Sequence, residues 1–400
     1  MNILIYTHSF APQIGGVETY AMLLARGLSL RRGVNPVHVT LVTQTPGNNF
    51  NDGGLPFAAV RRPGMVQLVN LIRRSDVVHL AGPVLAPLLL SILLRKPVVI
   101  EHHGYQASCP NGLLLLQPAR TACPDHFMRH EYRKCLRCNA SESGWLASVR
   151  MFLLIWPRRW LSRRANINLC VTQHVATRLQ LPHSAVVYHG VPGAEENTVA
   201  PAKVSEQAMG QSARPPVLSV AYLGRLVQEK GVPTLVEAIH LLQAEGKHVA
   251  LIIIGDGPER PHLEAMASAA PDLQARISFT GSLQDEKLSA ALAGADVLVM
   301  PSMNEEPAGL VVMEQMIRGC PVIVSDHGGG PELAGDGGLK FPPGDAAALA
   351  ACLMRLVDEP DLLRELGLRA RKRALAAFSL DRMVEEHYRM FERLASRAAR

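Results

Sequence analysis

Short apolar runs alternate with longer amphipathic segments along the first half of the chain. The strand-like runs lie at 2–7, 37–43, 76–80, 97–101, 167–172 and 185–189. Between the first two runs, the segment VETYAMLLARGLSLRRG carries apolar residues at helical spacing and ends at Gly33. Nearly continuous apolar strands separated by helices are typical of a parallel sheet covered on both faces. We therefore predict a doubly wound α/β domain over residues 1–195.

The pattern stops at a polar stretch, 196–215, which is rich in Pro, Ser, Ala and Gln and is typical of an interdomain linker. A second alternating series then predicts another α/β domain over 216–375, with strand-like runs at 217–224, 248–255, 276–281, 295–302 and 321–325. Ligands of such sheets bind beyond the carboxyl ends of the strands, so a shared ligand would lie in a cleft between the two domains. We expect a last helix, 376–400, to return to the N-terminal domain.

Composition narrows the partners that are compatible with this architecture. The 400 residues are 48% hydrophobic and 19% charged, as in a globular protein, and the net charge is +6 with a pI near 9.0. This balance permits a phosphorylated ligand or an anionic membrane, or simply a solvated cationic surface. No nucleic-acid-binding module is recognisable, so we do not expect that partner.

Hydrophobic runs also bear on the expected location of the protein. The longest apolar run, 84–94, is too short to span a bilayer, and the first residues form a strand-like segment rather than a leader. We therefore expect a cytoplasmic protein, whose seven cysteines are reduced, metal-bound or packed.

The segment PAGLVVMEQMIRG predicts a helix over about 309–318 with a carboxylate on or beside its apolar stripe. Glu314 is four residues from Leu310 and three from Ile317. Burying a carboxylate costs roughly several kcal/mol unless donors meet it, and two ribose hydroxyls are suitable donors. Glu306, in the preceding loop, can face the same ligand, while N–H groups at the helix start suit a diphosphate. A structural ion pair within the fold explains Glu314 equally well.

Two cations follow the first strand of the second domain, in GRLVQEKG at 224–231. Arg225 and Lys230 lie in the predicted strand-to-helix connection, with Gly231 at the helix start. They can clamp a pyrophosphate and neutralise charge on a leaving nucleoside diphosphate. The chain contains no Asp-x-Asp pair that would bind a divalent metal for this purpose. Solvated loop charges are the simpler interpretation of either residue alone.

A glycine pair opens the first helix directly after the first strand. Gly15 and Gly16 would let the backbone approach a ligand closely, and the helix start favours anions. The spacing is not that of the G-x-G-x-x-G dinucleotide motif. An ordinary turn also accounts for it.

In combination, these motifs resemble the retaining glycosyltransferases of family 4, which have the GT-B fold of two Rossmann-like domains facing a central cleft. The matching landmarks occur in the family's order along nearly the whole chain: GGVE at 15–18, GRLVQEKG at 224–231, PSMNEEPAGLVVMEQMIRGCPV at 301–322, GGGPEL at 328–333 and FPPGD at 341–345. One departure is His189–Gly190, which stands where the family usually has Asn-Gly.

The resemblance implies a role for each matched residue. Arg225 and Lys230 would hold the donor diphosphate, and Glu314 would accept the ribose hydroxyls. Glu306 would hold the transferred sugar. Backbone at Gly309 and Leu310 would contact sugar and phosphate, and Gly16 would contact the donor phosphate. His103, followed by Gly104, matches a histidine near the reacting carbon. The family has no settled protein nucleophile, so we assign none.

Four cysteines cluster in a segment, 105–140, that the family pattern does not require: Cys109, Cys123, Cys135 and Cys138. The last two form a C-x-x-C pair. Such a set fits a structural zinc site, but reduced and packed thiols fit equally well. We expect this insertion to shape the acceptor side of the site.

The segment 145–165 combines three tryptophans with five arginines and an apolar stripe. That composition suits the surface of an anionic membrane. A helix that packs its apolar face on the first sheet is the alternative, and both hold if only the Arg and Trp edge contacts lipid.

The sequence thus predicts a metal-independent retaining glycosyltransferase that uses a UDP-, GDP- or ADP-sugar. Its acceptor would be a glycan or a lipid-linked glycan of cell-surface polysaccharide, lipopolysaccharide or glycolipid synthesis. The expected location is the cytoplasm, peripherally at the inner face of the plasma membrane. A GT-B sugar-nucleotide epimerase and a catalytically silent nucleotide-sugar-binding subunit are the alternatives.

Overall fold

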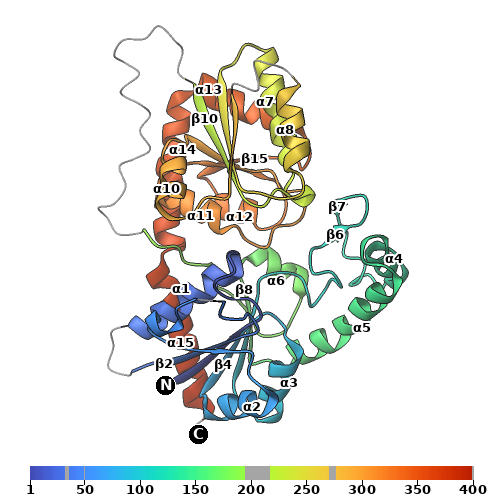
Figure 1. Cartoon of the computed structure of the whole chain (residues 1–400), viewed down its shortest axis with the longest axis vertical. Helices are drawn as coiled ribbons and strands as arrows, with labels where there is room; N and C mark the ends of the chain where they lie inside the picture. The colour runs from blue at the N-terminus through green and yellow to red at the C-terminus, as the bar shows by residue number, and fades with distance from the viewer. Residues whose placement is uncertain (32–35, 49, 194–216, 270–275, 399–400) are drawn as a thin grey trace. The chain divides into compact units, whose positions relative to one another are not determined.

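The computed structural model describes residues 1–31, 36–48, 50–193, 217–269 and 276–398. The chain divides into two compact units (Figure 1). The N-terminal unit comprises Met1–Ala119, Cys123–Pro192 and Phe378–Arg400, and the C-terminal unit comprises Arg120–Ala122 and Gly193–Ala377. The predicted linker, 196–215, lies outside the described residues.

The N-terminal unit is built on a seven-stranded parallel sheet with the order β3-β2-β1-β4-β5-β8-β9. Its strands are β1 (Asn2–Thr7), β2 (His38–Thr43), β3 (Ala58–Arg61), β4 (Val77–Ala81), β5 (Val98–His102), β8 (Ile167–Cys170) and β9 (Ser184–Val186). Its helices are α1 (Gly16–Leu30), α2 (Met65–Arg74), α3 (Leu85–Leu93), α4 (Tyr132–Ser143), α5 (Trp145–Ser162), α6 (Gln173–Leu179) and α15 (Leu380–Ala398), with a 3₁₀ turn, η1 (Asp52–Gly54). Two short strands, β6 (Leu115–Leu116) and β7 (Thr121–Ala122), lie in the cysteine-rich segment.

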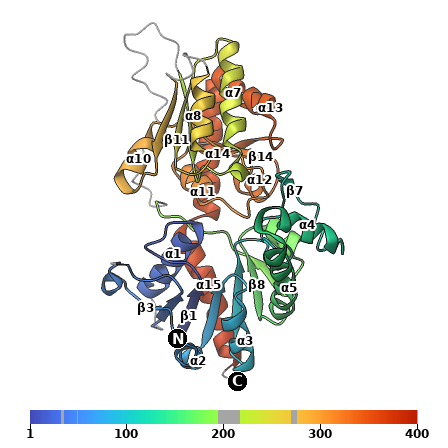
Figure 2. The same cartoon turned by 45° about the vertical axis from the view of Figure 1, so that its right-hand side comes forward.

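Alternation along the strands supplies apolar side chains to both faces of this sheet. Ile3 and Ile5 of β1 pack with residues of α1 and α15, whereas Leu4 and Tyr6 pack with residues of α2 and α3. The helices on the two faces are visible in Figures 1 and 2. The last helix, α15, therefore completes the core of the N-terminal unit, although it follows the C-terminal unit in the chain.

The C-terminal unit contains a six-stranded parallel sheet with the order β12-β11-β10-β13-β14-β15. Its strands are β10 (Leu218–Leu223), β11 (Val249–Ile254), β12 (Ile277–Gly281), β13 (Val297–Met300), β14 (Val322–Ser325) and β15 (Gly338–Phe341). Its helices are η3 (Gln228–Lys230), α7 (Val232–Ala244), α8 (Arg260–Ser268), α10 (Asp285–Ala293), α11 (Leu310–Ile317), α12 (Gly330–Ala334), α13 (Ala346–Asp358) and α14 (Pro360–Ala377).

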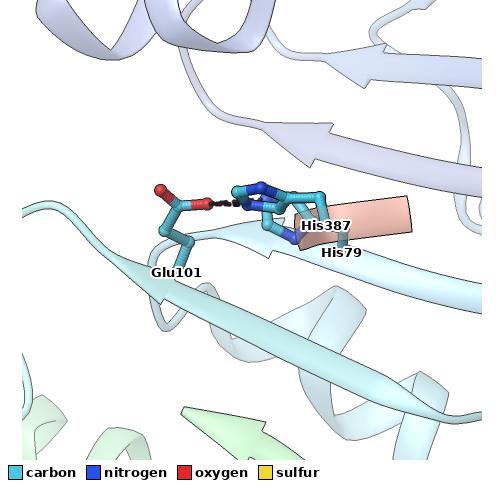
Figure 3. A group of neighbouring side chains, drawn as sticks. All are labelled: His79, Glu101 and His387. Atoms are coloured by element: carbon cyan, nitrogen blue, oxygen red, sulfur yellow. Dashed lines mark hydrogen bonds and ion pairs between the residues drawn. The ribbon is translucent and has the colours of Figure 1, made fainter. Parts of the chain in front are cut away.

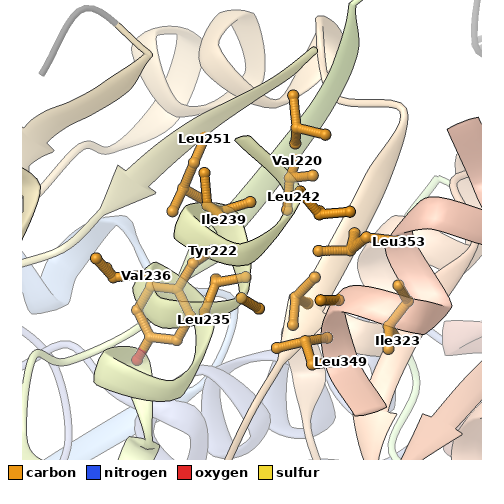
Figure 4. Packing of buried hydrophobic residues seen from close by; sticks show 14 of the residues in the cluster. Val220, Tyr222, Leu235, Val236, Ile239, Leu242, Leu251, Ile323, Leu349 and Leu353 are labelled. Atoms are coloured by element: carbon orange, nitrogen blue, oxygen red, sulfur yellow. The ribbon is translucent and has the colours of Figure 1, made fainter. Parts of the chain in front are cut away.

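One apolar core joins this sheet to α7 and α13. Val220, Tyr222 and Leu251 of the strands meet Leu235 and Ile239 of α7 in Figure 4. On other strands of the sheet, α11 and α12 contact β13 and β14. Helix α11 begins directly after the loop that carries Glu306, so its packing on the sheet fixes where that loop ends.

Within the described ranges, each helix is either too short or too polar to span a lipid bilayer.

Candidate active site

The sheet order places the two most informative motifs side by side in the C-terminal unit. β10 and β13 are hydrogen-bonded neighbours, and the chain winds outward from them in opposite directions. This is the topological switch point, where the carboxyl ends of parallel strands form a ligand crevice. Arg225 and Lys230 follow β10, and Glu306 lies in the loop that follows β13.

Lys230 and Glu306 form an ion pair at this switch point. Ser302 donates a hydrogen bond of 3.0 Å from its Oγ to the same oxygen of Glu306 that faces the ammonium group. Both charged side chains are mostly buried, with 25% of Lys230 and 11% of Glu306 exposed. Screening of this ion pair by water is therefore weak.

Gly231 is required for this approach of the two loops. It has a φ of +65°, and a Cβ atom there would lie 2.0 Å from the carbonyl oxygen of Pro301. The backbone N–H of Met303 also donates to the carbonyl of Glu229 over 2.8 Å. Only glycine allows the β10–α7 connection to pack this closely on the loop after β13.

The glycine-rich segment 328–330 supports the Glu306 loop from a second direction. Gly328 has a φ of +70°, and a Cβ atom there would lie 2.6 Å from the backbone nitrogen of Glu306. Gly329 donates a 2.6 Å hydrogen bond from its N–H to the carbonyl of Glu306. The GGGPEL landmark thus fixes the backbone that carries the carboxylate.

Arg225 differs from Lys230 in its surroundings. Its side chain is exposed, and its guanidinium has no ion pair within the described part of the chain. Its backbone carbonyl accepts a 2.9 Å hydrogen bond from the hydroxyl of Tyr222, which holds the turn. The site therefore presents one free guanidinium beside one ammonium group that is already neutralised.

Glu314 lies on α11, which starts after Gly309 with Leu310 as its first residue. Burial raises the pKa of Glu314, and Arg318 partly opposes this effect. Within the described ranges, the carboxylate forms no hydrogen bond or ion pair. The structural ion pair considered from the sequence is therefore not found there, and the carboxylate keeps its capacity to accept hydrogen bonds.

The remaining candidate residues belong to the N-terminal unit. Gly15 precedes α1 and Gly16 is its first residue. His103 follows β5, and both of its ring nitrogens are buried with no hydrogen-bond partner among the described residues. Burial lowers the pKa of His103 to about 3, so its imidazole is neutral at neutral pH.

A buried polar cluster next to His103 is not predicted by any motif in the sequence. His79 of β4, Glu101 of β5 and His387 of α15 converge (Figure 3), and the Tyr20 hydroxyl of α1 joins them. These residues lie far apart in the sequence. The available signal was local: Glu101 and His79 are polar residues inside apolar runs that read as strands buried on both faces.

The four clustered cysteines lie close enough for Cys135 to interact electrostatically with the other three thiols. Cys109, Cys123 and Cys135 are buried and Cys138 is half-buried. Burial raises the pKa of all four thiols, to about 12 for Cys109 and Cys135. Among the described residues, no set of three potential ligand atoms within 4.8 Å of one another contains a cysteine. The geometry therefore gives the zinc hypothesis no support.

Helix α5 presents two different faces. Ile155 and Leu161 on one face are buried, and Arg159 on that side donates a 2.8 Å hydrogen bond to the carbonyl of Leu179. The opposite face exposes large apolar side chains at helical spacing: Trp145, Leu146, Leu153, Trp156 and Trp160. Arg150, Arg163 and Arg164 are exposed along the same segment. Packing on the domain and an apolar outer surface thus coexist on one helix.

Solved structures define the class of protein to which this fold belongs. HepE from Anabaena in complex with UDP superposes with a TM-score of 0.72 at 18% identity, over 98% of this chain and 100% of HepE. Sucrose-phosphate synthase from Thermosynechococcus elongatus gives a TM-score of 0.72 at 20% identity over 99% of both chains. The fold is that of the GT-B glycosyltransferases.

Sequence comparison then gives the family. The family model described as Glycosyl transferases group 1 matches residues 218–359 of this chain. The α-D-kanosaminyltransferase of Streptomyces kanamyceticus is 30% identical over 296 residues, which is 74% of this chain and 70% of that enzyme. A GDP-mannose-dependent phosphatidylinositol monomannoside mannosyltransferase of Corynebacterium glutamicum is 25% identical over 96% of this chain and 95% of that enzyme. The chain belongs to the group 1 glycosyltransferases, and it is an enzyme of that kind.

Proposed function

We propose that this chain is a retaining glycosyltransferase that moves a sugar from a nucleoside diphosphate to an acceptor hydroxyl without a catalytic metal. The observation that carries the proposal is the grouping of Arg225, Lys230 and Glu306 at the switch point of the C-terminal sheet. Fixed cations there can stabilise the charge that develops on a departing diphosphate, which is the work a metal ion performs elsewhere.

In this proposal, each side chain of the donor site binds a particular part of the nucleoside diphosphate sugar. Arg225 and Lys230 hold the diphosphate, and the N–H groups at the start of α11, next to Gly309 and Leu310, add donors to it. Glu314, which has no partner within the described ranges, accepts the two ribose hydroxyls. Glu306 accepts hydroxyls of the transferred sugar once the diphosphate has engaged Lys230.

The N-terminal unit supplies the acceptor side of the reaction in this proposal. Gly15 and Gly16 allow the backbone to approach the donor phosphate, and His103 lies near the reacting carbon. Because burial lowers the pKa of His103 to about 3, its imidazole is a weak base and serves as a hydrogen-bonding group. The acceptor proton then passes to an oxygen of the departing diphosphate while the new glycosidic bond forms on the same face of the sugar.

The proposed donor is a UDP-, GDP- or ADP-sugar, and the proposed acceptor is a glycan or a lipid-linked glycan of the cell surface. HepE binds UDP, and the similar Corynebacterium enzyme is named for a GDP-mannose donor and a phosphatidylinositol glycolipid acceptor. Neither the epimerase nor the silent-subunit alternative is favoured by any of these relatives.

We further propose that the outer face of α5 binds an anionic membrane at the inner face of the plasma membrane. Exposed tryptophans at helical spacing suit the headgroup region, and Arg150, Arg163 and Arg164 supply complementary charge. The net charge of +6 favours the same partner. Binding there would bring the enzyme to lipid-linked acceptors.

The test combines donor binding with transfer. Nucleoside diphosphate sugars are screened by thermal shift, and the sugar that stabilises the protein most is assayed for transfer to lipid-linked acceptors. We expect Glu306→Ala to keep the donor-induced thermal shift and to lower turnover by about 100-fold. Glu365→Ala, which removes an exposed glutamate of α14, serves as the control. Absence of any stabilising donor, or full turnover by Glu306→Ala, would contradict the proposal.

A further inference from the structure

The carboxylate of Glu101 is completely buried at the end of β5, and imidazoles contact both of its oxygens. Oε2 lies 3.1 Å from Nε2 of His387 and 3.3 Å from Nε2 of His79 (Figure 3). The same oxygen accepts a hydrogen bond from the Tyr20 hydroxyl. Oε1 lies 3.3 Å from Nε2 of His189. One carboxylate therefore joins α1, β4, α15 and the segment that follows β9.

The neighbours of the two ring nitrogens of His387 indicate where its protons reside. Its Nδ1 lies 2.8 Å from the carbonyl oxygen of Met383, which can only accept, so Nδ1 carries a proton. Its Nε2 lies 3.1 Å from Oε2 of Glu101, and an ionised carboxylate can only accept. It also lies 3.1 Å from the Tyr20 hydroxyl, which donates its single proton to Glu101 and so has none to give to Nε2. Both ring nitrogens of His387 are therefore placed to donate hydrogen bonds, as they do in an imidazolium.

Glu101 is the negative partner of this imidazolium. Burial raises the pKa of Glu101, but hydrogen bonds from His189, His387 and His79 outweigh this and hold the pKa well below its usual range. Burial lowers the pKa of His79, so that ring is neutral. The buried group thus contains one negative and one positive charge, which is the arrangement that a buried ion pair needs.

A metal ion bound between Glu101, His79 and His387 fits the hydrogen-bonding surroundings of these residues less well than protons do. The oxygen and nitrogen atoms of Glu101, His79 and His387 lie within 4.8 Å of one another, as ligands do. A metal bound to Nε2 of His79 would leave a proton on its Nδ1, which has no partner among the described residues. An unsatisfied buried donor is costly, whereas an unused lone pair at the same nitrogen costs less.

The aromatic rings above Glu101 connect the ion pair to the predicted catalytic histidine. The Tyr20 ring lies 4.8 Å from the His103 ring and stacks on the His189 ring at 4.6 Å. The rings of His103 and His189 are 5.2 Å apart. Because Glu101 holds the Tyr20 hydroxyl and lies against His189, it determines where this stack can sit.

We propose that Glu101 and His387 form a buried carboxylate–imidazolium pair that positions His103 and His189 for sugar transfer. The C-terminal helix α15 thereby contributes a positioning residue to the acceptor side of the enzyme. The role of the pair in transfer rests on the proposed function of His103, but the charge state of the pair does not.

The first experiment measures the charge state directly in the intact wild-type protein. Histidine-selective ¹⁵N labelling and NMR at pH 7 report whether each ring carries one or two N–H protons, and His387→Gln assigns the signal. We expect two protons on His387 and one on His79. A singly protonated His387, or a stoichiometric metal ion in the purified protein by elemental analysis, overturns the proposal.

The second experiment measures positioning by kinetics. We expect Glu101→Gln and His387→Gln each to lower kcat by about 10- to 100-fold, as small displacements of reacting groups do. The donor KM should stay within about 3-fold, because the charged donor residues Arg225, Lys230 and Glu314 belong to the other unit. His102→Gln is the matched control, since His102 is equally buried on β5 but bonds to Asn168 instead.

The two failures are distinguishable. If Glu101→Gln and His387→Gln keep the kcat of His102→Gln while His103→Ala loses activity, positioning by the pair is wrong and the proposed function stands. If no donor binds and no transfer occurs in the wild type, the proposed function fails and positioning for transfer fails with it. The NMR measurement reports the ion pair in either case.

Discussion

Lys230 and Glu306 form an ion pair between the β10–α7 connection and the loop after β13, and Ser302 bonds to the same carboxylate. Each charge therefore satisfies the other before either meets a ligand. A diphosphate competes with Glu306 for the ammonium group, and its arrival would release a carboxylate oxygen toward the sugar. Donor binding and preparation of the sugar site are thus predicted to be one event.

Replacement of Lys230 by Ala should weaken donor binding by about 10- to 100-fold, because a hydrogen bond to a charged group contributes roughly 1.5–3 kcal/mol. Isothermal titration calorimetry with the nucleoside diphosphate sugar measures the change. Lys247→Ala is the control, since Lys247 forms an ion pair with Asp358 in the same unit. Equal affinities of the two variants would argue against a diphosphate contact at Lys230.

Glu314→Gln should raise the Tm of the protein at pH 8 and lower its affinity for the donor. Because burial raises the pKa of Glu314 above its ordinary value of 4.5, the native state binds this proton more tightly than the unfolded state does. Stability of the wild type therefore falls as pH rises through the interval from 4.5 to the raised value. The variant lacks this loss, so its Tm should exceed that of the wild type at pH 8 and approach it near pH 4.

The same substitution removes the acceptor for the ribose hydroxyls, so donor affinity at pH 8 should fall by about 10-fold. Glu365→Gln, at an exposed position on α14, should change neither quantity. A lower Tm of Glu314→Gln at pH 8 would mean that the carboxylate is structurally paired after all.

The outer face of α5 predicts binding to anionic vesicles. Leu153→Ser combined with Trp160→Ser should lower co-sedimentation with phosphatidylglycerol vesicles by about 10-fold, because apolar area no longer enters the headgroup region. Leu368→Ser, at an exposed apolar position on α14, is the control.

Arg163→Ser combined with Arg164→Ser should reduce the same binding mainly at low salt, since exposed charges are screened as ionic strength rises. Equal binding to uncharged phosphatidylcholine vesicles would exclude an electrostatic contribution. If the wild-type protein co-sediments with neither phosphatidylglycerol nor phosphatidylcholine vesicles, the membrane proposal is wrong.

The thiols of the insertion should react slowly. Because burial raises the pKa of Cys109 and Cys135 to about 12, almost no thiolate exists at pH 8, and iodoacetamide should label these residues only after unfolding. Mass spectrometry before and after denaturation measures this. A strong metal chelator should leave the Tm unchanged, and a fall in Tm on chelation would restore the zinc hypothesis.

The sequence predicts the strands and helices that bury apolar side chains in a regular pattern. The runs at 2–7 and 248–255 correspond to β1 and β11, and the helix expected over 309–318 is α11. Strand β3 was missed because it is a four-residue edge strand without a fully buried position. The run at 185–189 predicts one continuous strand, but β9 ends at Val186.

The candidate site was predictable where function requires a motif that is continuous in sequence, as around Lys230 and Glu306. Their mutual ion pair was not, because it depends on the order of strands in the sheet. The Glu101 cluster was less accessible still, since Tyr20 and His387 are 367 positions apart. Periodicity shows that a position is buried, but it does not show which distant side chain it meets.

Helix α15 places Met383, Phe391 and Leu394 in the core of the N-terminal unit. During synthesis, the N-terminal unit leaves the ribosome first, but it therefore cannot complete its core until α15 has been made. Until residues 380–398 emerge, the apolar face of α1 lacks its cover, and chaperones have a binding surface throughout translation of the entire second unit.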